Sequence, residues 1–89
     1  VDEDSVVASF AAPAFILGLK YSEIDFGERY GLEFVAATRP VEKRNVLGIK
    51  RMEPVVLDVV ADRELTVGES DVITLFGTRK RLQRFFEDK

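Results

Sequence analysis

The order of hydrophobic and polar residues predicts a series of strands followed by a final helix. In residues 32–39 the even-numbered positions share one face of a strand and the odd-numbered positions share the other, because side chains alternate along a strand. Residues 6–11, 55–61 and 71–76 are also predicted strands, and the last two are apolar on both faces. At least four strands are therefore expected.

The segments between these strands differ in character. Residues 20–30 mix charged and aromatic side chains, and Gly18, Gly27 and Gly31 lie before, within and after them, which predicts a short, broken helix. Residues 40–54 are charged and bounded by two prolines, and we predict a long loop or an exposed hairpin there. After Thr78, a suitable N-cap, an apolar stripe at i, i+3 and i+4 predicts a helix running to the C-terminus, with Leu82, Phe85 and Phe86 on one face. All seven phenylalanines fall on predicted apolar faces and are expected in the core.

This order predicts one α+β domain over residues 1–89. It contains a mostly antiparallel sheet of about four to five strands, a short broken helix and a C-terminal helix, with a charged loop or hairpin insertion at 40–54. Strands that are apolar on both faces need cover on both, yet only one full helix is available. Part of the sheet is therefore expected to meet another subunit, most simply in a homodimer.

Composition narrows the function. The chain has 89 residues, 46% of them hydrophobic, and a formal charge of −3, which argues against binding a nucleic-acid polymer. It has no Cys and no His, which removes disulfides, zinc–thiolate sites and the usual nucleophilic triads, so we predict that it is not an enzyme and has no metal site. The apolar run 6–18 contains Pro13 and is too short to span a bilayer, so no direct membrane insertion is expected.

The charges are unevenly distributed. Residues 39–51 hold five cations and one acid, and residues 79–84 hold four cations and no acid. Cations at a helix N-terminus face the positive end of the helix dipole, which is unfavourable by a few tenths of a kcal/mol each. The pattern favours a solvated basic face, with an ion-pair network or a phosphate site as the alternatives.

Four residues are candidates for binding a ligand. Arg39 ends an apolar strand, where a guanidinium can form a fork onto a phosphate or carboxylate, although an ordinary strand-ending Arg is the alternative. Asn45 in the following segment can donate its amide to a ligand, whereas a loop Asn is more often a turn residue. Lys43 and Arg44 complete the candidate set. Asp71 is expected to accept backbone amides and fix the turn before its strand.

One acidic group stands apart from the termini. Glu23, Asp25 and Glu28 lie within six residues, and three carboxylates can hold a hard cation such as Ca²⁺. They do not follow the ligand spacing of an EF-hand loop. A solvated acidic edge is therefore the favoured interpretation.

Two stretches in the correct order resemble the RCK C-terminal domain family, also called TrkA-C. The first comprises a Gly, a short helix, a Tyr-Gly pair and a strand ending in Arg, at residues 18–26, 29–32 and 34–39. The second is an acidic turn ending in Asp, an apolar strand, a Gly and a final helix, with its matching positions at Leu65, Val67, Gly68, Asp71, Val72, Ile73, Leu75, Phe76, Gly77 and Leu82. The likeness covers about residues 6 to 88.

The resemblance implies a non-enzymatic, cytoplasmic regulatory domain of a potassium or other cation transporter, channel or antiporter. Such domains pair as dimers, act at the inner face of the membrane on a transport subunit or domain in cis or in trans, and in some members bind cyclic di-AMP between subunits. No cofactor is required. By position, the strand-ending Arg that approaches the nucleotide phosphates in those members corresponds to Arg39, and the following hairpin corresponds to the loop with Asn45.

The chain departs from the family pattern after that Arg. Where the family has a short hairpin, residues 40–54 form a long basic segment, placed where a ligand sits in the nucleotide-binding relatives. Two hypotheses follow. The domain is a ligand-responsive regulatory dimer, or it is a purely structural assembly and docking domain with no small-molecule ligand.

Overall fold

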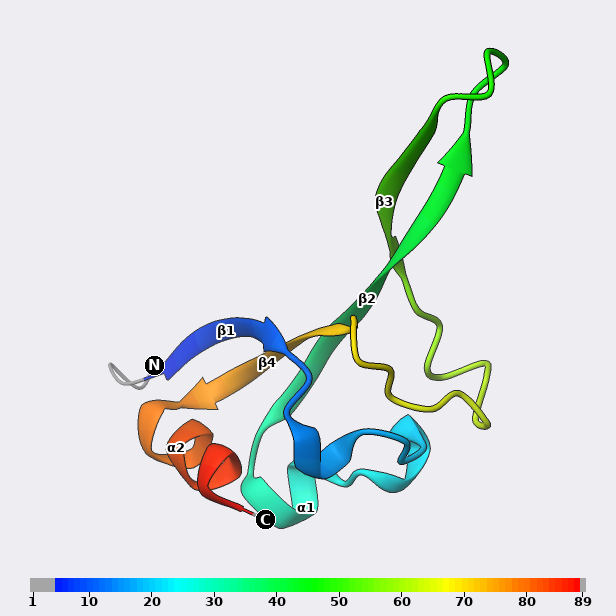
Figure 1. Cartoon of the computed structure of the whole chain (residues 1–89). Helices are drawn as coiled ribbons and strands as arrows, with labels where there is room; N and C mark the ends of the chain where they lie inside the picture. The colour runs from blue at the N-terminus through cyan, green and yellow to red at the C-terminus, as the bar shows by residue number, and fades with distance from the viewer. Residues whose placement is uncertain (1–4, 89) are drawn as a thin grey trace.

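The computed structural model describes residues 5–88, and Figure 1 shows its arrangement. The chain forms one curled sheet with short helices below it and a long hairpin that projects from one side. Its elements in chain order are β1 (Ser5–Ala11), η1 (Ala14–Ile16), η2 (Tyr21–Glu23), α1 (Phe26–Tyr30), β2 (Glu33–Arg44), β3 (Lys50–Val56), β4 (Val72–Thr78) and α2 (Arg79–Glu87). The predicted α+β class and the antiparallel sheet are confirmed.

The four strands lie in the order β1-β4-β2-β3, and every pairing is antiparallel. Both helices cover the same face of the sheet. The core lies between them, and Phe85 of α2 is fully buried against Ile73 and Leu75 of β4. Five other aromatic rings surround Phe85 with centroids 5.1 to 5.8 Å away, namely Phe10, Phe15, Phe26, Tyr30 and Phe86.

The strict alternation predicted for residues 32–39 is wrong at its centre. The pairing of Phe34 with Leu75 is followed by that of Ala36 with Thr74, so Val35 is one extra residue in β2. Such a β-bulge reverses the faces beyond it. Phe34 and Ala37 therefore both face the core, and Val35 is left 52% exposed.

The charged segment 40–54 is a hairpin rather than a loop, because β2 and β3 both continue into it. Pro40 pairs with Pro54 inside the ladder. The N–H of Leu57 donates to the carbonyl of Ala37 and the N–H of Asn45 to that of Ile49. The alternation of an antiparallel ladder then makes the proline pair a non-hydrogen-bonded one, in which neither proline needs an N–H.

The predicted strand 55–61 is wrong beyond its first two residues, since β3 ends at Val56. Asp58 turns the chain instead. Its side chain accepts from the N–H of Ala61 at 3.0 Å, and its carbonyl accepts from the N–H of Asp62 at 3.0 Å. An Asp that binds its own local backbone favours a turn over a strand, even in an apolar run.

The C-terminal helix begins as predicted, with Thr78 Oγ1 accepting from the N–H of Arg81 at 3.2 Å. It ends at Glu87, and Asp88 is already extended. The prediction that every phenylalanine lies in the core is wrong for two of them. Phe86 is 47% exposed, although it packs on Phe10, and Phe76 is 37% exposed on the far face of β4.

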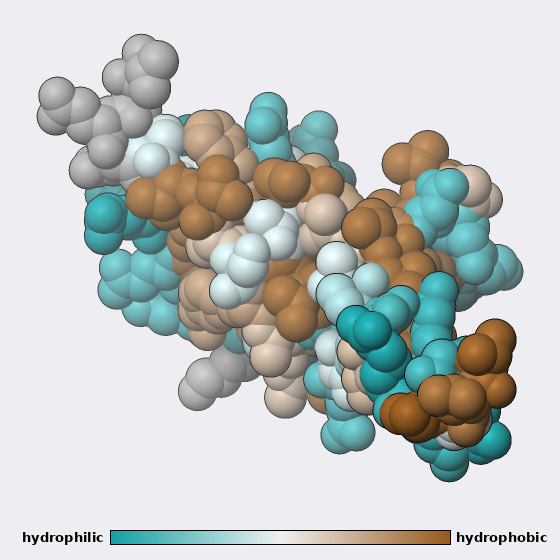
Figure 2. Space-filling view, turned by 90° about the horizontal axis from the view of Figure 1, so that it is seen from above, coloured by the Kyte–Doolittle hydropathy of each residue, from teal (hydrophilic) through white to brown (hydrophobic). Residues whose placement is uncertain are grey.

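The face of the sheet opposite the helices carries apolar side chains that nothing covers within residues 5–88 (Figure 2). We call it the outer face. Val7 of β1 lies opposite Phe76 of β4, and Val72 of β4 lies opposite Thr38 of β2, which in turn lies opposite Val56 of β3. This is the uncovered surface that the two-sided apolar strands predicted. No helix among residues 5–88 is long and apolar enough to span a bilayer.

Candidate functional site

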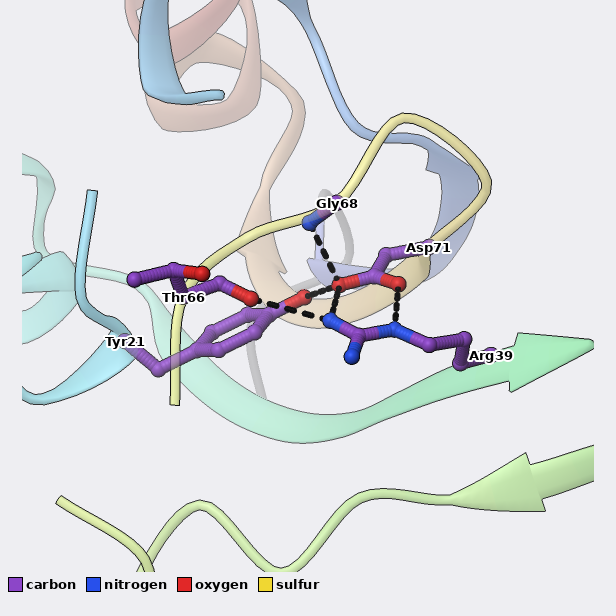
Figure 3. Close-up of polar contacts among 5 residues, drawn as sticks. All are labelled: Tyr21, Arg39, Thr66, Gly68 and Asp71. Carbon is purple, nitrogen blue, oxygen red and sulfur yellow. Dashed lines mark hydrogen bonds and ion pairs between the residues drawn. The ribbon is translucent and has the colours of Figure 1, made fainter. Parts of the chain in front are cut away.

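The middle of β2 and the start of β4 bring Arg39 against Asp71. The expectation that Arg39 ends its strand is wrong, because β2 continues to Arg44 as one side of the hairpin. Thr38 pairs with Val72 in an antiparallel ladder, so Arg39, which follows Thr38, lies opposite Asp71, which precedes Val72. Arg39 Nε lies 2.6 Å from Asp71 Oδ1, and Arg39 Nη2 lies 2.9 Å from Asp71 Oδ2 (Figure 3). The two side chains form a bidentate ion pair, the strongest geometry available to a guanidinium and a carboxylate.

Asp71 is fully buried, and every neighbour that reaches it is a donor. Oδ2 also accepts from the hydroxyl of Tyr21 at 2.6 Å and from the N–H of Gly68 at 2.9 Å. The Asp71 N–H donates to the carbonyl of Gly68 at 3.1 Å, which closes the turn before β4. The prediction that Asp71 fixes this turn is confirmed. The sequence also allowed Arg39 to form a fork onto a carboxylate, but it did not identify Asp71 as that carboxylate.

Glycine at position 68 lets the turn approach this closely. A Cβ there would lie 3.3 Å from Asp71 Oδ1 and 3.4 Å from Arg39 Nη2. The first distance is tighter than ordinary van der Waals contact, and the second is at its lower limit. The turn 68–71, β2 and the η2 segment therefore meet at one carboxylate.

The hydrogen bonds around Asp71 determine the charge states of Asp71, Arg39 and Tyr21. Burial alone would raise the pKa of Asp71, but hydrogen bonds from Arg39, Gly68 and Tyr21 outweigh it and lower the pKa below its usual range. Burial and the hydrogen bond to Asp71 both raise the pKa of Tyr21. The hydrogen bond to Asp71 likewise raises the pKa of Arg39. Asp71 is thus a carboxylate and Tyr21 a neutral phenol at neutral pH.

Tyr21→Phe tests this assignment on the alkaline side. Losing a hydrogen bond to a buried carboxylate is expected to lower the free energy of unfolding by about 2 kcal/mol at pH 7. Above about pH 10, tyrosine ionises in the unfolded chain while buried Tyr21 stays neutral, so the wild type alone loses this contribution as pH rises toward the folded pKa. Urea unfolding measures the free energy of unfolding of wild type and of Tyr21→Phe at each pH, and the two values should converge as pH rises. A difference that stays constant would contradict the assignment.

Arg39 is fixed by its hydrogen bonds but remains partly exposed to solvent. Its Nη2 also donates to the carbonyl of Thr66 at 2.9 Å, and its side chain remains 33% exposed. Nη1 has no partner among residues 5–88 and extends away from Asp71 (Figure 3). The site can therefore present one fixed N–H₂ group to an anion, although Asp71 already balances the charge of Arg39.

The other three predicted ligand residues lie on the hairpin, away from Arg39 (Figure 1). Lys43 follows Arg39 by four residues of extended strand, a span of about 13 Å. Asn45 lies at the turn, where its Oδ1 accepts from the N–H of Leu47 at 2.9 Å and of Ile49 at 3.0 Å. Within one chain, Arg39 does not converge with Lys43, Arg44 and Asn45.

The remaining charged groups form solvated surfaces. Arg79 and Lys80 of α2 are exposed, and Arg81 Nη1 donates to the carbonyl of Gly31 at 3.3 Å, at the end of α1. This fits the favoured interpretation of the basic stretch as a solvated face. Asp25 caps α1 by accepting from the N–H of Glu28 at 3.0 Å. Among residues 5–88, no acidic cluster is arranged to hold a metal ion.

Both the sequence and the fold can be set beside those of known proteins. No family model and no curated protein matches the sequence. A solved structure that resembles it is the regulator of conductance of K⁺ (RCK) C domain of the potassium transport protein KtrA, in complex with cyclic diadenosine monophosphate. The match covers 96% of this chain and 84% of that chain, with a TM-score of 0.62 and 16% identity.

The two chains share a fold. The likeness extends over almost all of this chain, so the resemblance predicted from the two stretches of sequence is confirmed at the level of the fold. At this identity the fold is what is shared, and the ligand named for that domain belongs to that domain.

Proposed function

We propose that the chain is a regulatory, ligand-sensing dimerisation domain of a potassium or other cation transport protein. The proposal places it in the cytoplasm, at the inner face of the membrane, acting in cis or in trans on a transport subunit. The ligand is a small anion, with cyclic di-AMP as the first choice. The proposed role is not enzymatic.

The observation that carries this proposal is the shared fold over 96% of the chain with a domain of a potassium transport protein that binds cyclic di-AMP. The sequence stretches that resemble the RCK C-terminal family fall on the elements that build the site. Arg39 directly follows the part of β2 that pairs with β4, and the acidic turn ends in its partner Asp71.

The outer face supports dimerisation. Val7 is 63% exposed, Val56 69% and Phe76 37%, on one continuous side of the sheet. A contiguous apolar surface of this kind marks an interaction site more often than free surface. A second copy is the simplest occupant, because a two-fold axis pairs the patch with itself.

Arg39 is the ligand contact in this proposal. Asp71 and Thr66 hold the guanidinium at two positions, so Nη1 is oriented before any ligand arrives. Lys43 and Arg44 lie too far along β2 to share a small ligand with Arg39 of their own chain. They reach the same ligand only from the partner copy, as does Asn45.

Calorimetric titration with cyclic di-AMP at moderate salt tests the proposal. We expect binding of one ligand per two chains. Arg39→Lys should weaken it tenfold or more, because lysine keeps a positive charge beside Asp71 but has no Nη1 group to donate. Lys43→Ala/Arg44→Ala should weaken it about fivefold.

Arg79→Ala/Lys80→Ala is the matched control, since it removes the same charge from exposed positions of α2. It should bind as the wild type does. Thermal unfolding of each variant separates loss of the ligand contact from loss of the fold. Heat of dilution alone from folded wild-type protein would remove this nucleotide as the ligand, and unchanged binding by Arg39→Lys would remove Arg39 from the site.

The alternative is a purely structural assembly and docking domain with no small-molecule ligand. The ion pair favours it, because Asp71 already neutralises Arg39. It predicts assembly that weakens as salt rises and does not respond to any nucleotide. Sedimentation across a salt series, with and without cyclic di-AMP, distinguishes the two functions.

A further inference from the structure

Among residues 5–88, the end of the β2–β3 hairpin carries the most exposed group of apolar side chains. We call residues 43–51 the hairpin tip. Val46 is fully exposed, Leu47 is 79% exposed and Ile49 is 58% exposed, at the point farthest from the body (Figure 1). Figure 2 shows this apolar cluster surrounded by hydrophilic side chains and separate from the apolar sheet.

Cations flank these apolar side chains on both strands. The tip contains Lys43, Arg44, Lys50 and Arg51 and no acid. Lys50 pairs loosely with Glu42 at 3.7 Å and Arg51 with Glu53 at 3.3 Å, farther down the hairpin, while Lys43 and Arg44 form no ion pair within residues 5–88. An apolar end flanked by cations is complementary to an anionic lipid surface, in which phosphates lie above an apolar layer.

Four backbone N–H groups of the tip are satisfied within the turn. The N–H groups of Leu47 and Ile49 donate to Asn45 Oδ1, and that of Gly48 donates to the Asn45 carbonyl at 3.0 Å. The Asn45 N–H donates in turn to the carbonyl of Ile49 at 3.1 Å. Backbone groups that are satisfied internally lose little when they leave water, which is the main obstacle to placing a turn at a lipid boundary.

The length of the hairpin keeps the acidic body away from such a surface. From the Thr38–Val56 pair to the Arg44–Lys50 pair the ladder advances six residues, or about 20 Å. Residues 40–54 carry four cations and two acids, and the rest of the chain, with nine cations and fourteen acids, is formally −5. At physiological salt, charges are screened over about 8 Å, so a surface at the tip attracts the cations without repelling the body.

We propose that the hairpin tip binds the surface of anionic lipid bilayers. Val46, Leu47 and Ile49 enter the boundary between headgroups and acyl chains, and Lys43, Arg44, Lys50 and Arg51 contact lipid phosphates. This differs from the sequence-based expectation of no direct membrane insertion, which considered only segments long enough to span. The proposal does not depend on a nucleotide ligand.

Sedimentation of the whole chain with vesicles tests the proposal. We expect binding to equimolar phosphatidylcholine–phosphatidylglycerol vesicles at least tenfold stronger than binding to pure phosphatidylcholine. Lys43→Gln/Arg44→Gln should weaken it about 25-fold, since each cation near an anionic surface contributes about fivefold. Leu47→Gln/Ile49→Gln should weaken it about tenfold without changing the charge.

The chain offers matched controls for both changes. Arg79→Gln/Lys80→Gln removes two exposed cations from α2, and Val60→Gln removes an 84% exposed apolar side chain from the β3–β4 connection. Neither should alter vesicle binding. Lys43 and Arg44 occur in the nucleotide proposal too, so Leu47→Gln/Ile49→Gln, which should leave cyclic di-AMP binding intact, separates the two.

A direct readout of insertion is available because the sequence has no Trp. Leu47→Trp creates a single reporter whose emission should shift to shorter wavelength with anionic vesicles, whereas Val60→Trp should not shift. Equal binding to both vesicle types, no binding to either, or an unshifted Leu47→Trp emission would overturn the proposal and leave the tip to a protein partner. A change from dimer to monomer in Leu47→Gln/Ile49→Gln without lipid would assign the tip to a second copy and would overturn it equally.

Discussion

Asp71→Asn is expected to lower the free energy of unfolding by about 3 kcal/mol, although the substitution changes a single atom type. Both carboxylate oxygens accept, Oδ1 from Arg39 Nε and Oδ2 from Arg39 Nη2, Tyr21 and Gly68. Either orientation of an asparagine amide places its NH₂ against another donor. The site is fully buried, so water does not relieve the conflict.

This loss is large relative to the free energy of unfolding of the whole domain. A domain of 89 residues is stable by roughly 4 to 13 kcal/mol, and a loss of about 3 kcal/mol lowers the melting temperature by on the order of 15 °C. Urea unfolding at pH 7 measures it. Glu64→Gln is the matched control, because Glu64 also lies close to a cation, 2.7 Å from Lys20, but is 79% exposed. It should change stability by about 0.5 kcal/mol or less.

Acid titration gives the same prediction a second readout. The folded pKa of Asp71 is lower than that of an unfolded aspartate, so its contribution is complete above about pH 4 and is lost as pH falls through the folded pKa. The difference in the free energy of unfolding between wild type and Asp71→Asn should therefore become smaller below pH 4. A difference that stays constant into acid would mean that the charge of Asp71 does not stabilise the fold.

This ion pair also marks where prediction from sequence ended. Local surroundings predict Arg39 to be a cation at a strand end and Asp71 to be an acid that fixes a turn, and β2 in fact continues past Arg39. Their contact depends on β4 lying beside β2, although 32 residues separate the two side chains. No local pattern encodes the order of strands in a sheet. Tyr21, the other side chain on Asp71, was missed for the same reason.

Predictions from sequence were correct for features that depend on neighbouring residues in one helix, and wrong where a single residue interrupts the pattern of a strand. The Thr78 cap and the apolar stripe of the last helix depend on neighbours within one helix. The cap is confirmed, and the stripe is confirmed at Leu82 and Phe85 but not at Phe86, which is 47% exposed. Val35 forms a bulge because of how β2 pairs with β4, which alternation alone does not reveal. Pro40 and Pro54 resembled boundaries, yet opposite one another they stay within the hairpin.

The outer face leads to the second large effect, which is expected from Phe76→Asp. If two copies meet through this face, a carboxylate at Phe76 is buried without a partner, and two-fold symmetry places it in the interface twice. The dissociation constant of the dimer should rise at least 100-fold. Sedimentation equilibrium should show a mass near twice 10.0 kDa for the wild type and near 10.0 kDa for the variant.

Two further variants make the result specific. Val7→Asp alters the residue opposite Phe76 in the β1–β4 ladder and should act in the same way. Val60→Asp alters an equally apolar but uninvolved position in the connection before β4 and should remain dimeric. Both Phe76 and Val7 point away from the core, so the melting temperature should move little. A monomeric wild type, or a dimeric Phe76→Asp, would contradict the assignment of this face.

The same variant connects assembly to ligand binding. A ligand that sits between two copies favours the dimer by as much as the dimer favours the ligand, because the coupling is reciprocal. Phe76→Asp should therefore lose cyclic di-AMP binding together with dimerisation, although Phe76 lies on the opposite side of the sheet from the Arg39 ion pair. Full binding by a monomeric Phe76→Asp would place the ligand within one chain, where Arg39 stands alone among the predicted cations.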